Sequence, residues 1–272
     1  MRLAVLGSGS SGNAVLVESA GRRLLVDAGF LCIEIDRRLA TLGLRKDELD
    51  AVAFTHEHQD HVRGAAVLLR RTRIPCFATA GTYEGTPSLP DLGTRRKVLV
   101  SGRPVEAAGF RLEPFAIPHD AKEPIGLVIE DSAGCRLGLV ADLGTRSRLA
   151  WGRLRDLDAL ILETNHDLDM LRHGPYPWAL KQRIAGRHGH LSNVDAADGI
   201  PEILSERLQM LVLYHLSRTN NTPALAAEAI GAKLDEERAD IKVVISEQER
   251  PTPWLELRGP RGVQQRLFVD NF

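Results

Sequence analysis

The stretch FTHEHQDH places four side chains that can bind metal ions within six residues, directly after a short apolar run. These side chains are His56, His58, Asp60 and His61. Imidazole and carboxylate ligands suit a divalent cation, Zn²⁺ foremost, with Mn²⁺ or Fe as further options. The alternating pair His56 and His58 can point to one site while Asp60 and His61 serve a neighbouring one. The spacing predicts a metal-binding loop at a strand end rather than a polar loop with a chance cluster of histidines.

This motif resembles the metal loop of the metallo-β-lactamase-fold hydrolases. In that family a His-x-His-x-Asp-His loop follows an apolar strand, as it does here. Four further motifs stand in the family's order: Asp27 in LLVDAG, His119 in AIPHDA, Asp142 in LGLVADLG and His215 in VLYHLS. The resemblance covers nearly the whole chain.

The resemblance implies an α+β fold, a four-layer αβ/βα sandwich with a dinuclear metal site at one edge. The implied ligands are His56, His58 and His119 for the first metal, Asp60, His61 and His215 for the second, and Asp142 as the bridge. A hydroxide held between two metal ions is a strong nucleophile at neutral pH, and the metals stabilise negative charge that develops on oxygen. Asp27 is expected to orient a ligand histidine rather than bind metal, and His166 is expected to support the site in the same way.

A second histidine motif, GHLSNVDAADGI, predicts a catalytic group that does not bind metal. Ser192 with Asp195 can cap a helix, so His190 lies just before a helix N-terminus, where amides favour a phosphate. A protonated His190, oriented by Glu163, could contact the scissile phosphate or protonate the leaving oxygen. The alternative is a surface or capping histidine. We expect Asp60, His190 and Glu163 to be the catalytic residues.

The glycines Gly7, Gly9 and Gly12 match the spacing of a dinucleotide-binding fingerprint, but a strand follows them where the fingerprint needs a helix. We therefore reject NAD binding and expect this Gly/Ser loop to lie beside the metal edge. Polar residues of this loop and of the segment after His215 are candidates to hold a terminal phosphate, with turn formation as the alternative for the first three. They are Ser10, Ser11, Asn13, Ser217, Asn220 and Asn221.

The C-terminal half distinguishes branches of the family. The segments LETNHDLDMLRHGPYPWALKQRI, GHLSN and YHLSRTNN resemble the YycJ/WalJ-like branch, which is linked to 5′-exonuclease activity on nucleic acid. Tyr176 and Trp178 could stack on bases or pack against the protein. The resemblance implies a phosphodiester hydrolase, a 5′-exonuclease acting on DNA or RNA. The alternative is a metallo-hydrolase of a small substrate, such as a cyclic phosphodiester or a thioester.

Composition limits the partners and the compartment. The chain has 272 residues, of which 43% are hydrophobic and 26% charged, and its net charge of −1 gives no bulk signal for nucleic acid or an anionic membrane. Its three cysteines are far apart, which favours a reducing compartment. The sequence shows no signal peptide and no apolar run of membrane-spanning length. We expect a single cytoplasmic domain over residues 1–272, in an oligomeric state that the sequence leaves open.

The elements that position these residues are mostly strands. Strands are predicted in the apolar run before Gly7 and at 14–18, 23–27, 51–54, 74–78, 97–100, 110–117, 125–130, 136–141, 159–163, 210–214, 242–246 and 254–257. Helices are predicted at 33–42, 62–71, 194–208 and 223–234, and residues 81–93 are expected to form a loop or irregular helix. This order suits a sheet-on-sheet core covered by helices.

Overall fold

Short runs rich in valine, leucine and isoleucine form two seven-stranded β-sheets within residues 1–259, the part of the chain that the computed structural model describes. The first sheet has the order β14-β1-β2-β3-β4-β5-β6, with β1 (Arg2–Gly7), β2 (Ala14–Ser19), β3 (Arg22–Val26), β4 (Ala51–Ala53), β5 (Cys76–Thr79), β6 (Arg96–Leu99) and β14 (Leu255–Glu256). The second has the order β13-β12-β11-β10-β9-β8-β7, with β7 (Val105–Ala107), β8 (Phe110–Ala116), β9 (Ile125–Asp131), β10 (Arg136–Val140), β11 (Ala159–Glu163), β12 (Met210–Tyr214) and β13 (Lys242–Ile245).

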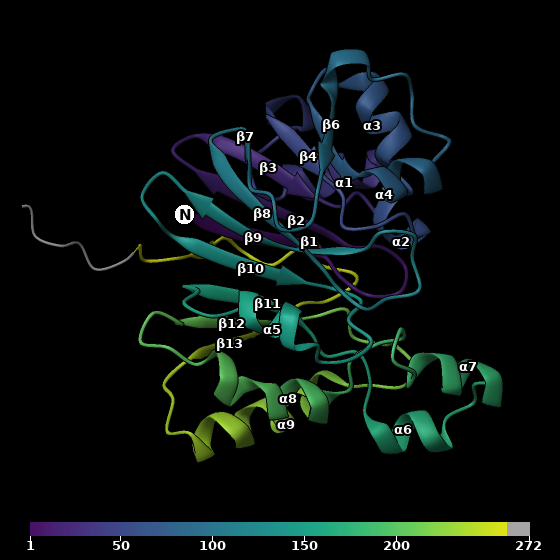
Figure 1. The fold of residues 1–272 in the computed structure, drawn as a ribbon, viewed down its shortest axis with the longest axis vertical. Helices are drawn as coiled ribbons and strands as arrows, with labels where there is room; N and C mark the ends of the chain where they lie inside the picture. Colours follow the sequence, from purple (N-terminus) through teal and green to yellow (C-terminus); the bar gives the residue numbers. More distant parts are fainter. Residues whose placement is uncertain (260–272) are drawn as a thin grey trace, which may run out of the picture.

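Helices cover the outer face of each sheet, which confirms the expected four-layer sandwich (Figure 1). The N-terminal half supplies α1 (Cys32–Ala40), α2 (Gln59–Val62), α3 (Ala65–Arg71), α4 (Ala80–Gly85) and the 3₁₀ turns η1 (Lys46–Glu48) and η2 (Gly93–Arg95). The C-terminal half supplies α5 (Arg148–Arg153), α6 (Leu168–His173), α7 (Trp178–Ile184), α8 (Asn193–Ile203) and α9 (Pro223–Glu236). Within residues 1–259, no helix is both long and apolar enough to cross a lipid bilayer.

Three apolar clusters hold the four layers together. In β2, Val15 and Val17 belong to the cluster between the two sheets, whereas Leu16 belongs to the cluster beneath the helices of the N-terminal half. Leu160 of β11 and Ile200 of α8 belong to the third cluster, outside the second sheet. Both faces of the sheets are therefore buried, which explains why the strands read as nearly continuous apolar runs.

The metal edge results from the direction of the strands. Strands β3 to β6 run parallel to one another, and so do β10 to β13. The carboxyl ends of parallel strands meet at the same edge of a sheet, where loops form binding sites. Residues that follow these strands in sequence are therefore brought together.

Two predicted helices differ from the structure at one end. The helix expected at 62–71 begins at Ala65 as α3, because Val62 closes the short α2 and Gly64 lies between them, where a Cβ would clash with the carbonyl oxygen of Phe30. The helix expected at 194–208 ends at Ile203, because Pro201 has no N–H to donate and weakens its last turn.

Four short helices lie in segments without a definite helix prediction. The segment expected at 81–93 to be a loop or irregular helix begins with α4, whose first turn is capped by the side chain of Thr79. Helices α5, α6 and α7 were not predicted; each has only six or seven residues, and α7 buries none of them. Helices this short or this exposed leave no extended periodic apolar pattern in the sequence. The predicted single domain included residues 260–272, which lie outside the described part of the chain.

Candidate metal centre

The metal-binding side chains lie in loops that follow strands at one edge of the sandwich. Asp27 directly follows β3, His56 follows β4 after two residues, and His215 directly follows β12. Asp27, Asp142 and His215 have left-handed backbone angles, with φ of 62°, 54° and 59°. This conformation is uncommon, although aspartate and histidine adopt it more readily than most residues. At these three points the chain leaves the strand and the side chain enters the cluster.

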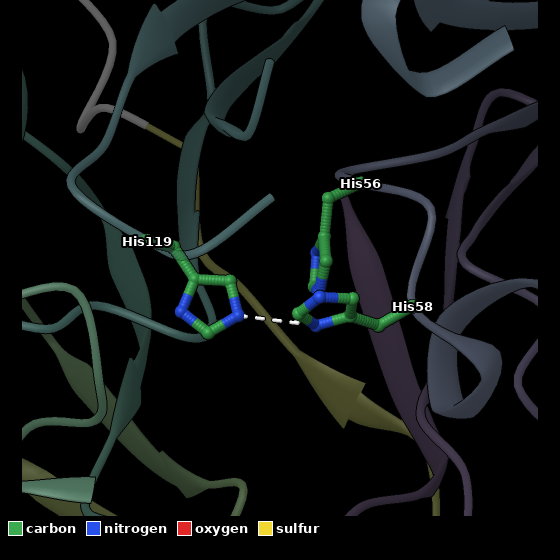
Figure 2. Close-up of side chains that lie close together, drawn as sticks. All are labelled: His56, His58 and His119. Atoms are coloured by element: carbon green, nitrogen blue, oxygen red, sulfur yellow. Dashed lines mark hydrogen bonds between the residues drawn. The ribbon is translucent and has the colours of Figure 1, made fainter. Parts of the chain in front are cut away.

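Three histidines surround one point (Figure 2). Ring nitrogens of His56, His58 and His119 lie within 4.8 Å of one another, and His119 Nε2 is 3.2 Å from His58 Nδ1. Other ring nitrogens are held by the protein: His56 Nδ1 is 3.1 Å from the Thr55 hydroxyl, and His119 Nδ1 is 3.1 Å from the Gly189 carbonyl oxygen. The remaining nitrogens face a common space and are free to act as ligands.

A second group lies beside the first and shares a carboxylate with it. Asp60, His61 and His215 each bring one ligand atom within 4.8 Å of the others, and His215 Nε2 is 3.3 Å from Asp60 Oδ2. Asp142 Oδ2 is 2.7 Å from His61 Nε2 and 3.4 Å from His56 Nε2. Asp142 therefore lies between the two groups, at the position expected of a bridging ligand.

Buried polar atoms that converge on one space indicate what this cluster accommodates. His56 Nε2 is buried and forms no hydrogen bond with residues 1–259, and the buried carboxylate oxygens of Asp142 face ring nitrogens of His61 and His215. Leaving buried polar atoms without partners is costly, so convergent lone pairs of this kind fit a cation between them. Imidazole and carboxylate groups are the donors that Zn²⁺ and Mn²⁺ accept. The side chains present thus fit divalent metal ions.

Electrostatics keep His56 and Asp142 in their ligand forms. Burial lowers the pKa of His56 well below its usual value, so this imidazole is neutral. Burial alone would raise the pKa of Asp142, but His215 and His61 hold that pKa well below its usual value. Asp142 is therefore an ionised carboxylate even though it is buried.

Glu163, at the end of β11, contacts two histidines at once. Its Oε1 lies 2.8 Å from His190 Nδ1 and 3.0 Å from His215 Nδ1, while its Oε2 accepts a hydrogen bond from the Leu143 amide. Burial opposes protonation of His190, but Glu163 and Asp142 raise its pKa to about 9. The structure thus brings Asp60, Glu163 and His190 to one cluster, with His190 as a cation.

The segment around His190 folds as the sequence indicated. The Ser192 side chain accepts a hydrogen bond from the Asp195 amide and caps α8. His190 lies two residues before this cap, and its side chain is partly exposed. A partly exposed cationic imidazole beside a metal-binding cluster can donate a hydrogen bond or a proton to a substrate oxygen.

The two expected supporting residues differ in their contacts. Asp27 Oδ2 is 2.8 Å from His61 Nδ1, and Thr55 donates hydrogen bonds to the same carboxyl group. His166 is also buried, but it belongs to none of the possible metal-binding groups in the described residues. Burial lowers its pKa to about 4. Its backbone bridges to Ser192, so its observed contacts hold the loop that precedes α8.

A cavity of about 310 Å³ opens over the metal cluster and is lined partly by Ser10, His190 and Arg183. Among the six residues expected to contact substrate, Ser10 and Ser11 are exposed on the Gly/Ser loop. Ser217 is largely buried and lines a second cavity next to the first. The three serines therefore lie at or near accessible surfaces.

The three asparagines of the same set are buried beneath these surfaces. The Asn13 side chain accepts hydrogen bonds from the Ser8 hydroxyl and the Gly9 amide, and so shapes the Gly/Ser loop. Asn221 forms paired side-chain hydrogen bonds with Asn193. Both amide atoms of Asn220 are buried without a hydrogen-bond partner in residues 1–259. These contacts favour a loop-shaping role for Asn13 and Asn221.

Several residues of the site escaped sequence reasoning. The Ser8 hydroxyl accepts a hydrogen bond from the His215 amide at 2.7 Å, and Gln248 binds the Gly/Ser loop through the Ser11 amide and the Gly12 carbonyl. Asp120 lies 3.4 Å from His119 and also binds Arg183. Asp120 could have been found from its position next to His119. Gln248 had no such signal, because its partners are more than 200 residues away.

The chain is similar in sequence to proteins of known family. A family model described as a beta-lactamase superfamily domain matches residues 22–215. The chain is 32% identical over 266 residues to exodeoxyribonuclease WalJ of Streptococcus pneumoniae, covering 94% of this chain and 98% of that protein. It is 33% identical over 238 residues to exodeoxyribonuclease YycJ of Bacillus anthracis, covering 87% of this chain and 90% of that protein.

Solved structures support the same architecture. The metallo-beta-lactamase fold protein YhfI from Bacillus subtilis superimposes with a TM-score of 0.71 at 18% identity. The match covers 92% of this chain and 98% of that chain. At this level of identity the likeness concerns the fold, which agrees with the two sheets and their outer helices.

Proposed function

This chain belongs to the beta-lactamase superfamily, and we propose from this premise that it is a metal-dependent exodeoxyribonuclease that hydrolyses phosphodiester bonds from a 5′ end. One observation carries the proposal. Nearly the full length of the chain matches proteins named exodeoxyribonucleases, and the seven predicted ligand side chains meet at one edge of its fold. The 5′ polarity rests on the resemblance of the C-terminal motifs.

The ligand assignment follows the two groups of side chains. His56, His58 and His119 would hold one divalent ion, Zn²⁺ or Mn²⁺ first and Fe as a further option. Asp60, His61 and His215 would hold a second, with Asp142 between them. When bound, such ions activate water and neutralise charge that develops on phosphate oxygens.

The chain's own residues supply orientation and a proton. Glu163 fixes the His190 ring through Nδ1, which leaves Nε2 available for the substrate. From the edge of the cavity, His190 can donate this Nε2 proton to a phosphate oxygen or to the leaving oxygen. Ser10 and Ser217, on the two flanking loops, line a cavity together with His190 and would contact the strand end.

The test is digestion of single-stranded DNA labelled at its 5′ or its 3′ end, with Zn²⁺ or Mn²⁺ added to the purified protein. We expect release of the 5′ label as mononucleotides while the 3′-labelled strand shortens progressively, and faster digestion of a 5′-phosphorylated strand than of a 5′-hydroxyl strand. A circular strand should resist. The Asp142→Ala variant is the matched control for contaminating nucleases, because it removes the carboxylate between the two ligand groups.

Other outcomes would assign a different reaction. Equal cutting of circular and linear strands would show an endonuclease. Inactivity on both DNA and RNA, with turnover of a cyclic phosphodiester or a thioester, would place the chain among hydrolases of small substrates.

A further inference from the structure

The segment from Leu168 to His190, which contains α6 and α7, differs in charge and burial from the rest of the chain. It carries four arginine and lysine residues against one aspartate, whereas the whole chain has a net charge of −1. The two helices are tied together by a hydrogen bond from Lys181 to the Arg172 carbonyl oxygen. Trp178 is 69% exposed, and α7 has no buried residue. Figure 1 shows both helices at the lower right, to one side of α8 and α9.

This segment forms one wall of a cavity beside the metal cluster. The cavity has a volume of about 180 Å³, and this segment lines it with Tyr176, Leu180 and Ile184. Ser10 and Ser217, from the two loops that flank the cluster, line it as well. The cavity thus combines an aromatic ring and two aliphatic side chains, which suit the face of a nucleobase, with hydroxyls that suit sugar or phosphate oxygens.

Arg183 lies where this cavity meets the cavity over the metal cluster, since it lines both. Its Nε donates a hydrogen bond to Asp120 at 2.6 Å, and this is its only side-chain hydrogen bond with residues 1–259. The side chain is 64% exposed. Asp120 therefore fixes the guanidinium group while its two terminal nitrogens remain free, an arrangement suited to a phosphate bound through two parallel hydrogen bonds.

We propose that residues 168–190 form a nucleotide subsite of this enzyme, in which Arg183 binds the phosphate next to the one that is cleaved and Tyr176 contacts the adjoining base. The inference rests on the proposed function, because it takes a DNA strand as the ligand. It adds a binding surface to the metal cluster and explains how a chain of slightly negative net charge holds a polyanion. The positive charge is local and lies beside the cluster.

The first experiment compares two substrates for Arg183 variants. The substrates are a 5′-phosphorylated single-stranded oligonucleotide and bis(p-nitrophenyl) phosphate, which has one phosphate and no neighbouring nucleotide. Arg183→Gln should lower kcat/KM on the oligonucleotide about 10- to 100-fold, mainly through KM, and by at least tenfold more than on the small substrate. Arg183→Lys keeps the charge and the Asp120 contact but loses the planar fork, so it should show a smaller loss of the same kind.

The second experiment measures binding without turnover. Fluorescence anisotropy of a labelled oligonucleotide, with a chelator present, should give a higher Kd for Arg183→Gln. Tyr176→Ala should raise the Kd about 5- to 100-fold, and Tyr176→Phe, which keeps the ring, should recover most of the binding. Arg238→Gln is the matched charge control. Arg238 is exposed and precedes β13, whose first residue, Lys242, pairs with Met210. Met210 begins β12, whereas His215 follows the other end of that strand. Arg238→Gln should therefore bind the oligonucleotide with the wild-type Kd.

The outcomes separate the subsite from the proposed function. If the wild type digests DNA and both Arg183 variants digest it equally fast, the subsite is overturned while the nuclease proposal stands. Equal losses on both substrates would also overturn it, because Arg183 would then act through Asp120 on the metal-binding histidines. A wild-type protein that binds the strand through Arg183 but digests no DNA would support the subsite and overturn the nuclease proposal.

Discussion

His61 Nδ1 lies 2.8 Å from a carboxylate oxygen of Asp27, and His61 Nε2 on the opposite side of the ring points to Asp142 at 2.7 Å. A carboxylate at Nδ1 holds the proton on that nitrogen and leaves the Nε2 lone pair free. The pair therefore sets both the tautomer and the direction of a candidate ligand. Thr55 binds the same carboxyl group and fixes it in turn.

We expect Asp27→Asn to weaken metal binding about 10- to 100-fold, because an amide cannot hold the His61 proton as a carboxylate does. Asparagine tolerates the left-handed backbone at this position, so the loop should keep its shape. Competition with a chromophoric chelator measures the affinity. Asp50→Asn is the control, because Asp50 precedes the first residue of β4 and the metal loop follows the other end of that strand. Wild-type affinity in Asp27→Asn would show that the pair does not tune the metal.

Metal content tests the two ligand groups separately. Elemental analysis should find about two divalent ions per wild-type chain. His58→Ala should reduce this toward one, because His58 belongs only to the first group, and Asp142→Ala should weaken both sites together with activity. His173→Ala changes an exposed histidine outside every group and should keep the full content. Full occupancy in Asp142→Ala would remove its bridging role.

His190 is expected to act on the substrate and not as a ligand. His190→Ala should retain its metal while its rate falls roughly 10²- to 10⁴-fold. His188→Ala changes an exposed histidine of the same segment that lines neither cavity, and it should keep the wild-type rate. Rates under saturating substrate, measured together with metal content, check this. Loss of metal from His190→Ala would instead make His190 a ligand. Its Nδ1 lies 3.1 Å from Asp142 Oδ1, close enough to the metal cluster for that role.

The FTHEHQDH loop could be predicted from sequence because its signal is local, with four possible ligands within six residues directly after an apolar strand. The other candidate ligands, His119, Asp142 and His215, were identified through the family resemblance of their motifs. The burial of Asn13 and Asn221 could not be predicted from the residues next to them in the sequence. Asn221 pairs with Asn193, 28 positions away, and Asn13 reaches Asp60, 47 positions away. Their depth depends on how distant loops pack, so composition could not separate them from the exposed serines.

The α6–α7 segment was also beyond sequence reasoning. Its helices bury little, so they lack the amphipathic pattern by which the helix at 33–42, α1, was recognised. Tyr176 and Trp178 were identified as candidates for stacking or packing, and the structure gives them different surroundings: Tyr176 lines a cavity, whereas Trp178 is exposed. Arg183 stood out only after Asp120 and the two cavities were known.

An acid-sensitive contact supports the Gly/Ser loop from below. Arg38 is 95% buried and donates hydrogen bonds to the carbonyl oxygens of Leu6 and Gln248, at the base of that loop. Its charge is balanced by Glu34, at 2.6 Å. Hydrogen bonds from Arg37 and then from Arg38 lower the pKa of Glu34 to about 2, against the burial that would raise it.

Because the folded-state pKa of Glu34 is depressed, its contribution to stability is complete above pH 4.5 and is lost as the pH falls toward 2. Glu34→Gln should lower the free energy of unfolding by about 1–3 kcal/mol at pH 7, and more than half of this difference should disappear by pH 3. Urea denaturation of both proteins across this range measures it. Glu228→Gln, an exposed carboxylate on α9 without an ion pair in residues 1–259, should differ little from the wild type at any pH. A difference for Glu34→Gln that stays constant from pH 7 to pH 3 would mean that packing, and not the charge on Glu34, holds Arg38 in place.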